Sequence, residues 1–393
     1  MTGPAGREEV LYMDNLSRIS DGNGKGRLAL HRDAFLLCCL LVCFAPACWS
    51  GGLNWGALFD TGRPPSADVK KYQARVLELA KANTGKKFTA VEKIVSEGKL
   101  PTEPGVARSR AATGDIPMLL KLSVCARTAP EPGLKKECRQ AALRGLREWA
   151  LVYKPAGNPI NENSLVPWIQ AWDIMNPLLT EDERQPLEAF ARALVAAGDK
   201  FYGGMKVSDG RYYNNWASWR LCVRGLVSAA LNDEALLRSS RDLAEAQISH
   251  NILPDGSTFD LHQRDALLYH VYDLEALTLL AAQMPEDFLP AGARAAVASA
   301  VGYLEPFYTG KKVHIEFAGS KVPFDIKRKE NAMPDYQNAP WKPEHARKLL
   351  RLARTVFPGV AKWSGSVVDE QYDPMLKLQA AALEQQGAGA VPK

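Results

Sequence analysis

Two segments of the sequence carry side chains that could do chemistry. The first reads RYYNNWASWR over residues 211–220, where two adjacent asparagines stand among tyrosines and tryptophans. Asn214 or Asn215 could simply cap the helix that follows, but adjacent amides among so many aromatic rings exceed what a cap needs. Aromatic rings stack on the C–H face of a sugar, and amides donate hydrogen bonds to its hydroxyls and carboxylates. The segment therefore predicts a carbohydrate site that includes Tyr213 and Trp216.

The second segment, residues 254–272, combines an Asp-Gly-Ser turn with histidines, an arginine and two tyrosines. Helical spacing places Tyr269 and Tyr272 about 60° apart, on a face away from the apolar stripe. His270 lies between that face and the core, so it is either a base or a buried histidine with satisfied nitrogens. Arg264 is either a cation for the tyrosines or an ion-paired arginine. This segment offers groups that can transfer protons.

Together, the two segments resemble the alginate lyase domain, a family shared by lyases that act on poly-mannuronate, glucuronan and oxidised cellulose. The resemblance rests on the aromatic-Asn-Asn-x-x-x-Trp helix start and on the later Asp-Gly-Ser, Arg and Tyr-His helix, and it is clearest from about Asn161 to Leu280. Two positions depart from the family pattern. Trp216 replaces a histidine, and His262 stands where the family has an arginine, with Arg264 two residues later. The chain therefore resembles a divergent branch, closer to the glucuronan lyases.

The resemblance implies β-elimination at a 4-linked uronate, which leaves a 4,5-unsaturated end. Such an enzyme must neutralise the sugar carboxylate, remove the C5 proton and protonate the departing O4. We assign Asn215, with Asn214 in support, to neutralising the carboxylate. Tyr269 is the expected base and acid, with Tyr272 and His270 as competitors.

Further residues complete the expected site. A cation beside a tyrosine favours its phenolate form, and Arg264 is the obvious candidate. His262 is an alternative base. Gln170 and Trp168 are expected to line the cleft, although a tryptophan is more often a core residue. Arg328 is an expected substrate contact, although basic runs are more often solvated surface.

Two other functions stay open on the residues alone. An α/α toroid also hosts glycoside hydrolases, which need two carboxyl groups across the scissile bond. Asp173, Asp255, Asp260 and Asp265 could serve, although Asp255-Gly256 is typical of a turn. A non-catalytic periplasmic protein that binds polyuronate is the other alternative. No cofactor or metal is expected, because the six histidines show no metal-ligand spacing and no phosphate-binding glycine loop is present.

The elements that must position these residues are helices. Apolar residues recur at three- and four-residue spacing along most of the chain, and alternating β-branched runs are scarce. The pattern predicts an all-α single domain, an α/α toroid or incomplete barrel with the site at one rim. Residues 313–340 show little helical periodicity and are expected to cross that rim. The predicted helices cover residues 67–82, 116–128, 133–153, 164–176, 180–198, 213–231, 233–250, 265–283, 290–308 and 343–356.

The N-terminal region predicts export. Residues 34–47 read AFLLCCLLVCFAPA, an apolar run that falls short of the roughly 20 residues of a membrane span. The run and its Ala-Pro-Ala end are typical of a secretory signal. We predict a leader over residues 1–48, a lyase-like domain over 49–385, a disordered tail over 386–393, no stable membrane span, and a periplasmic or secreted location.

Charge and cysteines limit the partners. The net charge of +5 is too small to indicate a nucleic-acid binder, and it favours an anionic partner such as a uronate polysaccharide. We expect a monomer. Export would permit a Cys125–Cys138 disulfide; otherwise both residues, with Cys222, are buried thiols.

Overall fold

Helices account for the regular structure of residues 52–60, 62–365 and 373–388, which are the residues that the computed structural model describes. No strand occurs within these ranges, where the extended pairings are two isolated bridges, Ile252 with Thr258 and Ile315 with Pro340. The predicted all-α class is therefore confirmed. The predicted leader, residues 1–48, lies outside the described residues.

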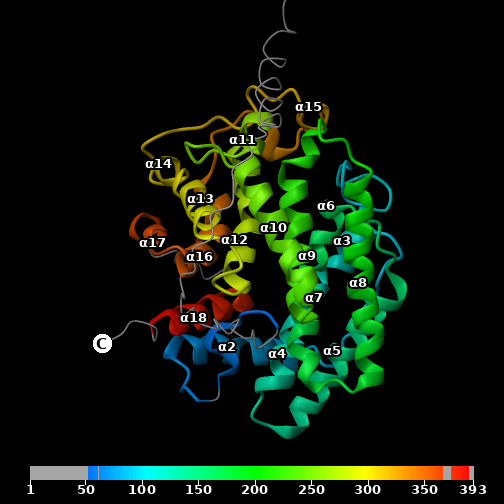
Figure 1. The fold of residues 1–393 in the computed structure, drawn as a ribbon. Helices are drawn as coiled ribbons and strands as arrows, with labels where there is room; N and C mark the ends of the chain where they lie inside the picture. The colour runs from blue at the N-terminus through cyan, green and yellow to red at the C-terminus, as the bar shows by residue number, and fades with distance from the viewer. Residues whose placement is uncertain (1–51, 61, 366–372, 389–393) are drawn as a thin grey trace, which may run out of the picture. The chain divides into compact units, whose positions relative to one another are not determined.

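The helices form two layers (Figure 1). In the inner layer α4, α7, α9, α12 and α16 pack each on the next, and in the outer layer α5, α8, α10, α13 and α17 cover them. The inner helices are α4 (Ile116–Thr128), α7 (Val166–Met175), α9 (Asn215–Ala230), α12 (Leu267–Gln283) and α16 (Arg347–Val356). The outer helices are α5 (Pro132–Val152), α8 (Glu181–Gly203), α10 (Glu234–Asn251), α13 (Ala291–Gly302) and α17 (Pro358–Ser364).

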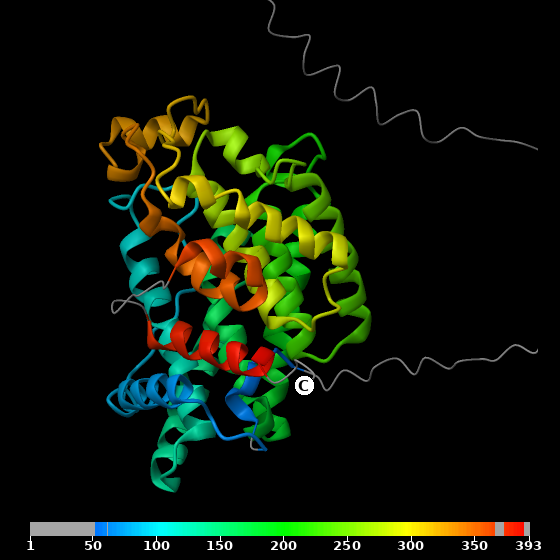
Figure 2. The same ribbon diagram turned by 90° about the vertical axis from the view of Figure 1, so that its left-hand side faces the viewer.

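The two ends of the described chain close the inner layer into a ring. α18 (Pro374–Ala388) packs on α16 and on α2 (Ala67–Lys81), and α2 packs on α4 (Figure 2). This arrangement is the predicted α/α toroid. The shorter elements are η1 (Gly56–Phe59), α3 (Val106–Gly114), α6 (Pro159–Glu162), η2 (Asn163–Leu165), η3 (Asn176–Leu178), η4 (Gly210–Tyr212), α11 (Phe259–Arg264), α14 (Glu305–Tyr308), α15 (Pro323–Glu330), η5 (Pro334–Tyr336) and η6 (Pro343–Ala346).

Local sequence signals set several helix boundaries. The Ser66 hydroxyl accepts a hydrogen bond from the Val69 amide at the start of α2. Thr180 and Glu183 form a capping box at the start of α8, in which each side chain accepts from the backbone of the other. These contacts satisfy backbone N–H groups that have no partner inside the helix.

Several elements differ from the prediction; α8, for example, continues to Gly203, five residues beyond its predicted end. The predicted helix over 290–308 is divided into α13 and α14. Residues 313–340 contain the eight-residue helix α15, which is too short to show a clear apolar period. α18 continues to Ala388, three residues into the predicted tail, and the rest of that tail lies outside the described residues. Within the described ranges, no helix is both long enough and apolar enough to cross a membrane.

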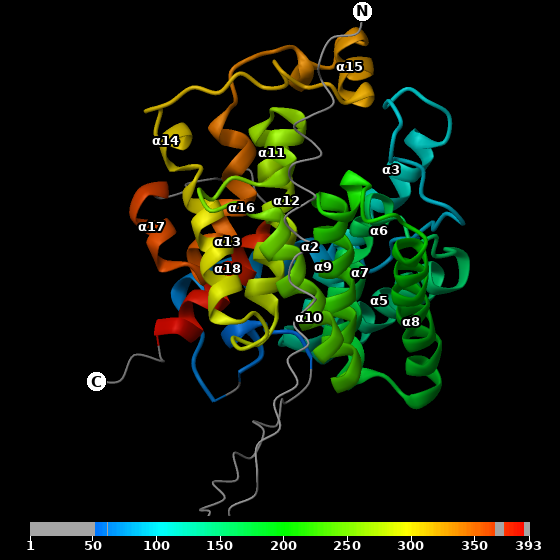
Figure 3. The ribbon, with the colours of Figure 1, turned by 45° about the horizontal axis from the view of Figure 1, so that its top comes forward.

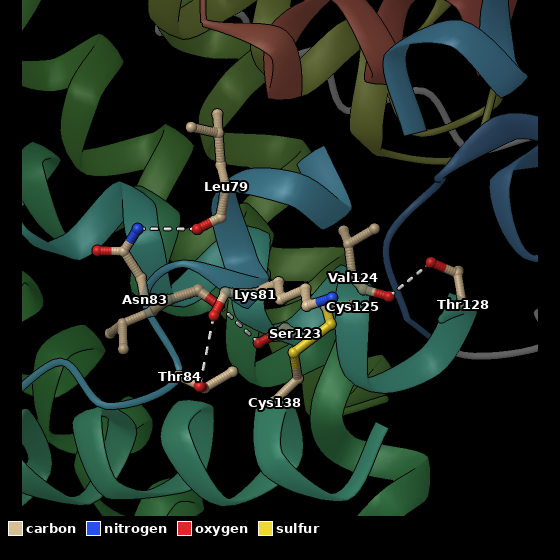
Figure 4. Close-up of a disulfide and its surroundings, with 10 residues drawn as sticks. Leu79, Lys81, Asn83, Thr84, Ser123, Val124, Cys125, Thr128 and Cys138 are labelled. Carbon is tan, nitrogen blue, oxygen red and sulfur yellow. Dashed lines mark hydrogen bonds between the residues drawn. A yellow bond between two sulfur atoms is a disulfide. The ribbon is translucent and has the colours of Figure 1, made fainter. Parts of the chain in front are cut away.

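A disulfide joins the inner and outer layers (Figure 4). It links Cys125 of α4 to Cys138 of α5, with the two Cα atoms 5.9 Å apart. The alternative of two buried thiols at these positions is therefore wrong. Cys222 is a buried free thiol, as expected for a core residue of α9.

Candidate active site

Three helices bring residues of the second sequence segment to one end of the described unit (Figures 1 and 3). α11 leads into α12, and α15 lies at the same end. The junction residue Asp265 has φ of +48°, in the left-handed region, so the chain turns sharply between α11 and α12. That turn places Tyr269 and Tyr272 in the first turns of α12.

Tyr269 lies between two arginines. Arg328 Nη1 donates a 2.6 Å hydrogen bond to the phenol oxygen. The Arg264 guanidinium lies 3.8 Å from the centroid of the phenol ring. A charged donor at the oxygen and a guanidinium over the ring therefore place positive charge on two sides of this phenol. Tyr269 is partly exposed, so a substrate can reach it.

Asp325 holds both arginines. Its Oδ1 lies 2.5 Å from Arg264 Nη1 and 3.7 Å from Arg328 Nη1, and Ser320 Oγ donates to its Oδ2 at 2.8 Å. The Asp325 side chain is only 1% exposed. Burial raises the pKa of this carboxyl, while the two arginines and Ser320 lower it. One carboxylate thus faces two guanidinium groups, which leaves positive charge beside the phenol.

Arg264 lies beside Tyr269, where a cation is expected, but the cation at the phenol oxygen is a different arginine. Arg264 stacks on the ring face and pairs with Asp325, whereas Arg328 donates to the oxygen. The physical reason is the path of residues 313–340, which brings α15 to the first turns of α12. Arg328 therefore contacts the candidate base itself, in addition to any contact with substrate.

Tyr272 is partly exposed, as Tyr269 is, but its polar neighbours are different. Its phenol oxygen accepts a 2.5 Å hydrogen bond from Asn163 Nδ2, and its ring lies 5.4 Å from that of Trp219. Burial raises the pKa of Tyr272, and the nearby Tyr269 and Glu275 raise it further. A neutral phenol is thus favoured at Tyr272, so Tyr269 is the better candidate for the base.

Asn215 is held by a buried carboxylate. Its backbone N–H donates to Asp260 Oδ2 at 2.6 Å, and its Nδ2 donates to Asp260 Oδ1 at 2.5 Å. Burial raises the pKa of Asp260 to about 6, against the lowering by Asn215 and Arg264. Asp273 lies in the same polar interior, and burial raises its pKa well above the ordinary value. Asn215 is 1% exposed, so Asp260 holds its amide inside the fold.

Asn214 caps a helix. Its Oδ1 accepts a hydrogen bond from the Trp216 amide at the start of α9, and its Nδ2 donates to Gln263 Oε1 at 3.2 Å. The side-chain groups of Asn214 are thus used within the fold, and the residue is 2% exposed. The supporting role proposed for Asn214 is replaced by the capping alternative.

The central part of the chain matches a family of known enzymes. Residues 129–314 match the family model described as alginate lyase. This segment is similar to the alginate lyase family. It contains both sequence segments that predicted the site, α9 and its cap as well as α11 and α12. The match confirms the predicted family and the predicted enzyme class, polysaccharide lyase. α15, with Asp325 and Arg328, lies beyond the matched residues.

Solved structures of alginate lyase A1-III are similar to this chain. The enzyme from Sphingomonas species A1 is 18% identical with a TM-score of 0.48, and the comparison covers 80% of this chain and 94% of that chain. A tyrosine-to-phenylalanine variant of A1-III complexed with tetrasaccharide is 16% identical with a TM-score of 0.40, covering 77% of this chain and 81% of that chain. Among curated proteins, none matches the sequence.

His270 lies in the core of the alginate lyase segment. Its Nδ1 lies 3.0 Å from Thr258 Oγ1 and its Nε2 lies 2.9 Å from the Ala300 carbonyl oxygen. Burial lowers the pKa of His270 to about 4. A neutral ring with both nitrogens in hydrogen bonds cannot collect a substrate proton, so the prediction of His270 as a competing base is wrong.

His262 is exposed and lies on α11. Its Nε2 is 2.7 Å from Ser257 Oγ, and that hydroxyl donates to Asp255 Oδ1 at 2.6 Å. These contacts tie His262 to the turn before α11, while Tyr269 contacts Arg264 and Arg328. The structure therefore does not bring His262 to the candidate base.

Trp168 and Gln170 belong to the core, and their predicted place in the cleft is wrong. Trp168 is 0% exposed, and its Nε1 donates to the Leu146 carbonyl oxygen at 3.1 Å. Gln170 Nε2 donates to Gln283 Oε1 at 2.7 Å. Both residues lie on α7, an inner helix that is buried along nearly its whole length, so neither can touch a polysaccharide.

Trp216 packs inside an aromatic cluster and offers little surface for a sugar. It is 7% exposed and stacks on Phe201 at 6.1 Å. Tyr213 is partly exposed and lies 5.3 Å from the His250 ring, so it remains a candidate contact. A cavity of about 510 Å³ opens near this cluster and is lined by Phe201, Gly204, Met205, Lys206, Ser208, Asp209 and Arg211.

Several site residues escaped the sequence analysis. The sequence suggests Asp260 only as a hydrolase carboxyl, and it gives no sign that Asn163 contacts Tyr272. Asp325 stands three positions before Arg328, and this i,i+3 spacing of opposite charges was a usable signal. Among the described residues, no group of three or more His, Cys, Asp or Glu side chains is placed to hold a metal ion.

Proposed function

We propose that this chain cleaves 4-linked polyuronates by β-elimination, acting on alginate poly-mannuronate and on glucuronan or oxidised cellulose. The observation that carries the proposal is the phenol of Tyr269, with Arg328 at its oxygen and Arg264 on its face. The alginate lyase match over residues 129–314 supports the same chemistry.

The residues have separate roles in the proposed reaction. Once substrate binding uncovers it, the second N–H of Asn215 Nδ2 donates to the C6 carboxylate, which makes the C5 proton more acidic. The phenolate of Tyr269 takes that proton, the C4–C5 double bond forms, and the C4–O4 bond breaks. The phenol then returns the proton to O4 of the leaving chain. Arg328 stabilises the phenolate, so one tyrosine serves as base and acid on one face of the sugar.

We also propose that the mature protein works in the periplasm or outside the cell, as a monomer. A secretory leader is expected over residues 1–48, and a Cys125–Cys138 disulfide is typical of an oxidising compartment. Mass spectrometry of the exported protein would give the mature N-terminus and the state of the cysteines. Light scattering would give the number of subunits.

A substrate panel tests the proposed reaction. Purified protein is incubated with poly-mannuronate, poly-guluronate, glucuronan and oxidised cellulose, and the absorbance of the new double bond is followed. We expect a signal on at least one of them, with unsaturated oligosaccharides in the products. New reducing ends without that absorbance would indicate hydrolysis. Binding without any product would indicate a non-catalytic protein, and either outcome contradicts the proposal.

A further inference from the structure

The first turn of α12 is capped by a residue far along the chain. Ala266, at the N-cap position, offers no side-chain acceptor. Glu316 takes its place, because its Oε1 accepts from the Leu267 N–H at 2.8 Å and its Oε2 accepts from the Leu268 N–H at 3.1 Å. A carboxylate at this end also interacts favourably with the helix dipole. The second capped residue, Leu268, directly precedes Tyr269.

The segment that carries Glu316 is itself fixed on both sides. On one side, the Phe317 N–H donates to the Asp265 carbonyl oxygen at 2.7 Å, and His314 Nε2 lies 3.1 Å from the same oxygen. On the other side, the Glu316 N–H donates to the Ala339 carbonyl oxygen at 3.0 Å. Residues 314–317 therefore form a clamp on the junction between α11 and α12.

Two residues at this clamp, next to the site, have backbone conformations that are unusual for non-glycine residues. Asp265 and Phe317 both have positive φ, +48° and +59°, although neither is glycine. Such conformations are costly and persist only where the surroundings impose them. The Phe317 ring lies 6.0 Å from Tyr269 and stacks on Tyr336 at 4.4 Å. The same short segment thus contacts the candidate base through its ring and fixes the start of its helix through Glu316.

We propose that Glu316 is a positioning residue for Tyr269. By capping α12, its carboxylate sets where the phenol oxygen lies relative to Arg328. The inference rests on the proposed function, in which Tyr269 is the base. Glu316 lies just beyond the residues that match the family model, which end at 314.

The charge of Glu316 matters to this role. The residue is 3% exposed, and burial raises its pKa to about 7, against the lowering by the two backbone donors. Asp265 and Asp335 also raise this pKa, and His314 Nε2 lies 3.8 Å from Glu316 Oε1. As the pH falls through about 7, a proton occupies one carboxyl oxygen and the cap weakens. Activity is therefore expected to fall as the pH drops below about 7, in part because Glu316 becomes protonated.

The test compares Glu316→Gln with a matched control, Glu183→Gln. Glu183 also caps a helix with its carboxylate, accepting from the Thr180 N–H at 2.9 Å, but it does so at the start of α8. We expect Glu316→Gln to lower kcat about 10- to 100-fold with KM within about threefold, because a displaced reacting group slows the chemical step. In the same variant, activity should fall less steeply toward acidic pH than in the wild-type protein, because the titrating carboxyl of Glu316 is absent. Glu183→Gln should lose stability and keep kcat. A folded Glu316→Gln protein with wild-type kcat and an unchanged pH profile overturns the proposal.

Amide hydrogen exchange gives a second readout that needs no activity. Capped N–H groups at Leu267 and Leu268 should be protected in the wild-type protein, and Glu316→Gln should speed their exchange at least about tenfold. The control variant should leave these amides unchanged. Equal exchange in Glu316→Gln and wild type would refute the cap. A wild-type protein that is inactive on every polyuronate, yet shows the protected amides, would instead refute the proposed function.

Discussion

Two regions of the molecule differ in how much of their interior is polar. Around α4, α5 and α7 the interior is mostly apolar, with Trp149, Trp168 and Trp172 at 0% exposure and a disulfide between two of the helices, although α7 also buries Asp173. At the Tyr269 end, charged Asp325 and Asp260 are buried beneath the surface, and the backbone holds positive φ at non-glycine residues. Apolar packing and a cross-link stabilise a fold, whereas buried charges and strained backbone cost stability. The first region therefore contributes stability to the fold, and the second holds the phenol of Tyr269 in position.

The largest expected effect is the loss of activity in Tyr269→Phe. The variant removes only the phenol oxygen that accepts from Arg328. We expect kcat to fall about 10³-fold or more, which corresponds to about 4 kcal/mol of transition-state stabilisation. The thermal midpoint should fall only modestly, because one hydrogen bond, from Arg328 to the phenol oxygen, is lost. Initial rates of double-bond formation, measured together with thermal unfolding, check both statements. Retention of wild-type rates would remove Tyr269 from the mechanism.

Removal of the disulfide should lower stability and leave activity almost unchanged, which is the reverse of the effect expected for Tyr269→Phe. The Cys125–Cys138 bridge closes a loop with a sequence separation of 13, so the double variant Cys125→Ala/Cys138→Ala should lose about 3 kcal/mol of unfolding free energy. At a temperature where this variant is folded, kcat should stay within about twofold of wild type. Denaturant unfolding and lyase assays on the same preparation test the separation of the two regions. A large loss of kcat in the folded variant would show that the regions are coupled.

The sequence predicts much of the first region and only part of the second. The helix predicted over 116–128 is α4, because continuous apolar spacing defines it. Tyr269 and Tyr272 are also found from helical spacing. The hydrogen bond between Arg328 and Tyr269 spans 59 positions, and the cap from Glu316 to Leu267 spans 49. Both depend on how residues 313–340 fold back, and that stretch has little periodicity. Residue type alone predicts that Trp168, Gln170, Asn214 and Trp216 lie at the site. The structure buries all four side chains, so they support the fold instead.

A buried acid in the apolar region should make stability depend on pH. Asp173 accepts from Trp55 Nε1 at 2.7 Å and from the Leu53 N–H at 3.1 Å. Burial raises its pKa from 3.8 to about 6, despite these donors and Arg127. The folded state therefore holds the proton more tightly than the unfolded state. The resulting stability is fully present below pH 3.8 and is lost as the pH rises through about 6.

The matched variant is Asp173→Asn, which carries no titrating group. Between pH 4 and pH 7, wild type should lose about 2 to 3 kcal/mol more unfolding free energy than the variant does. Urea unfolding at several pH values gives the two slopes. The pH dependence of kcat should be the same in both proteins, because Asp173 lies in the first region. Equal slopes of stability would show that Asp173 does not titrate in this range.

The smallest effect is expected for Tyr272→Phe, which lies one helical turn from Tyr269. Its phenol oxygen accepts from Asn163, so the variant should lose about 1 kcal/mol of stability through a broken hydrogen bond. Activity should fall less than about fivefold, because Tyr269 keeps its ring contact and both arginines. The centroids of the two tyrosine rings are 6.2 Å apart. The two variants therefore test neighbouring phenols that differ in their polar neighbours. If Tyr272→Phe abolished activity while Tyr269→Phe did not, the base would be Tyr272, and the arginines would act on the substrate carboxylate instead of on the phenol of Tyr269.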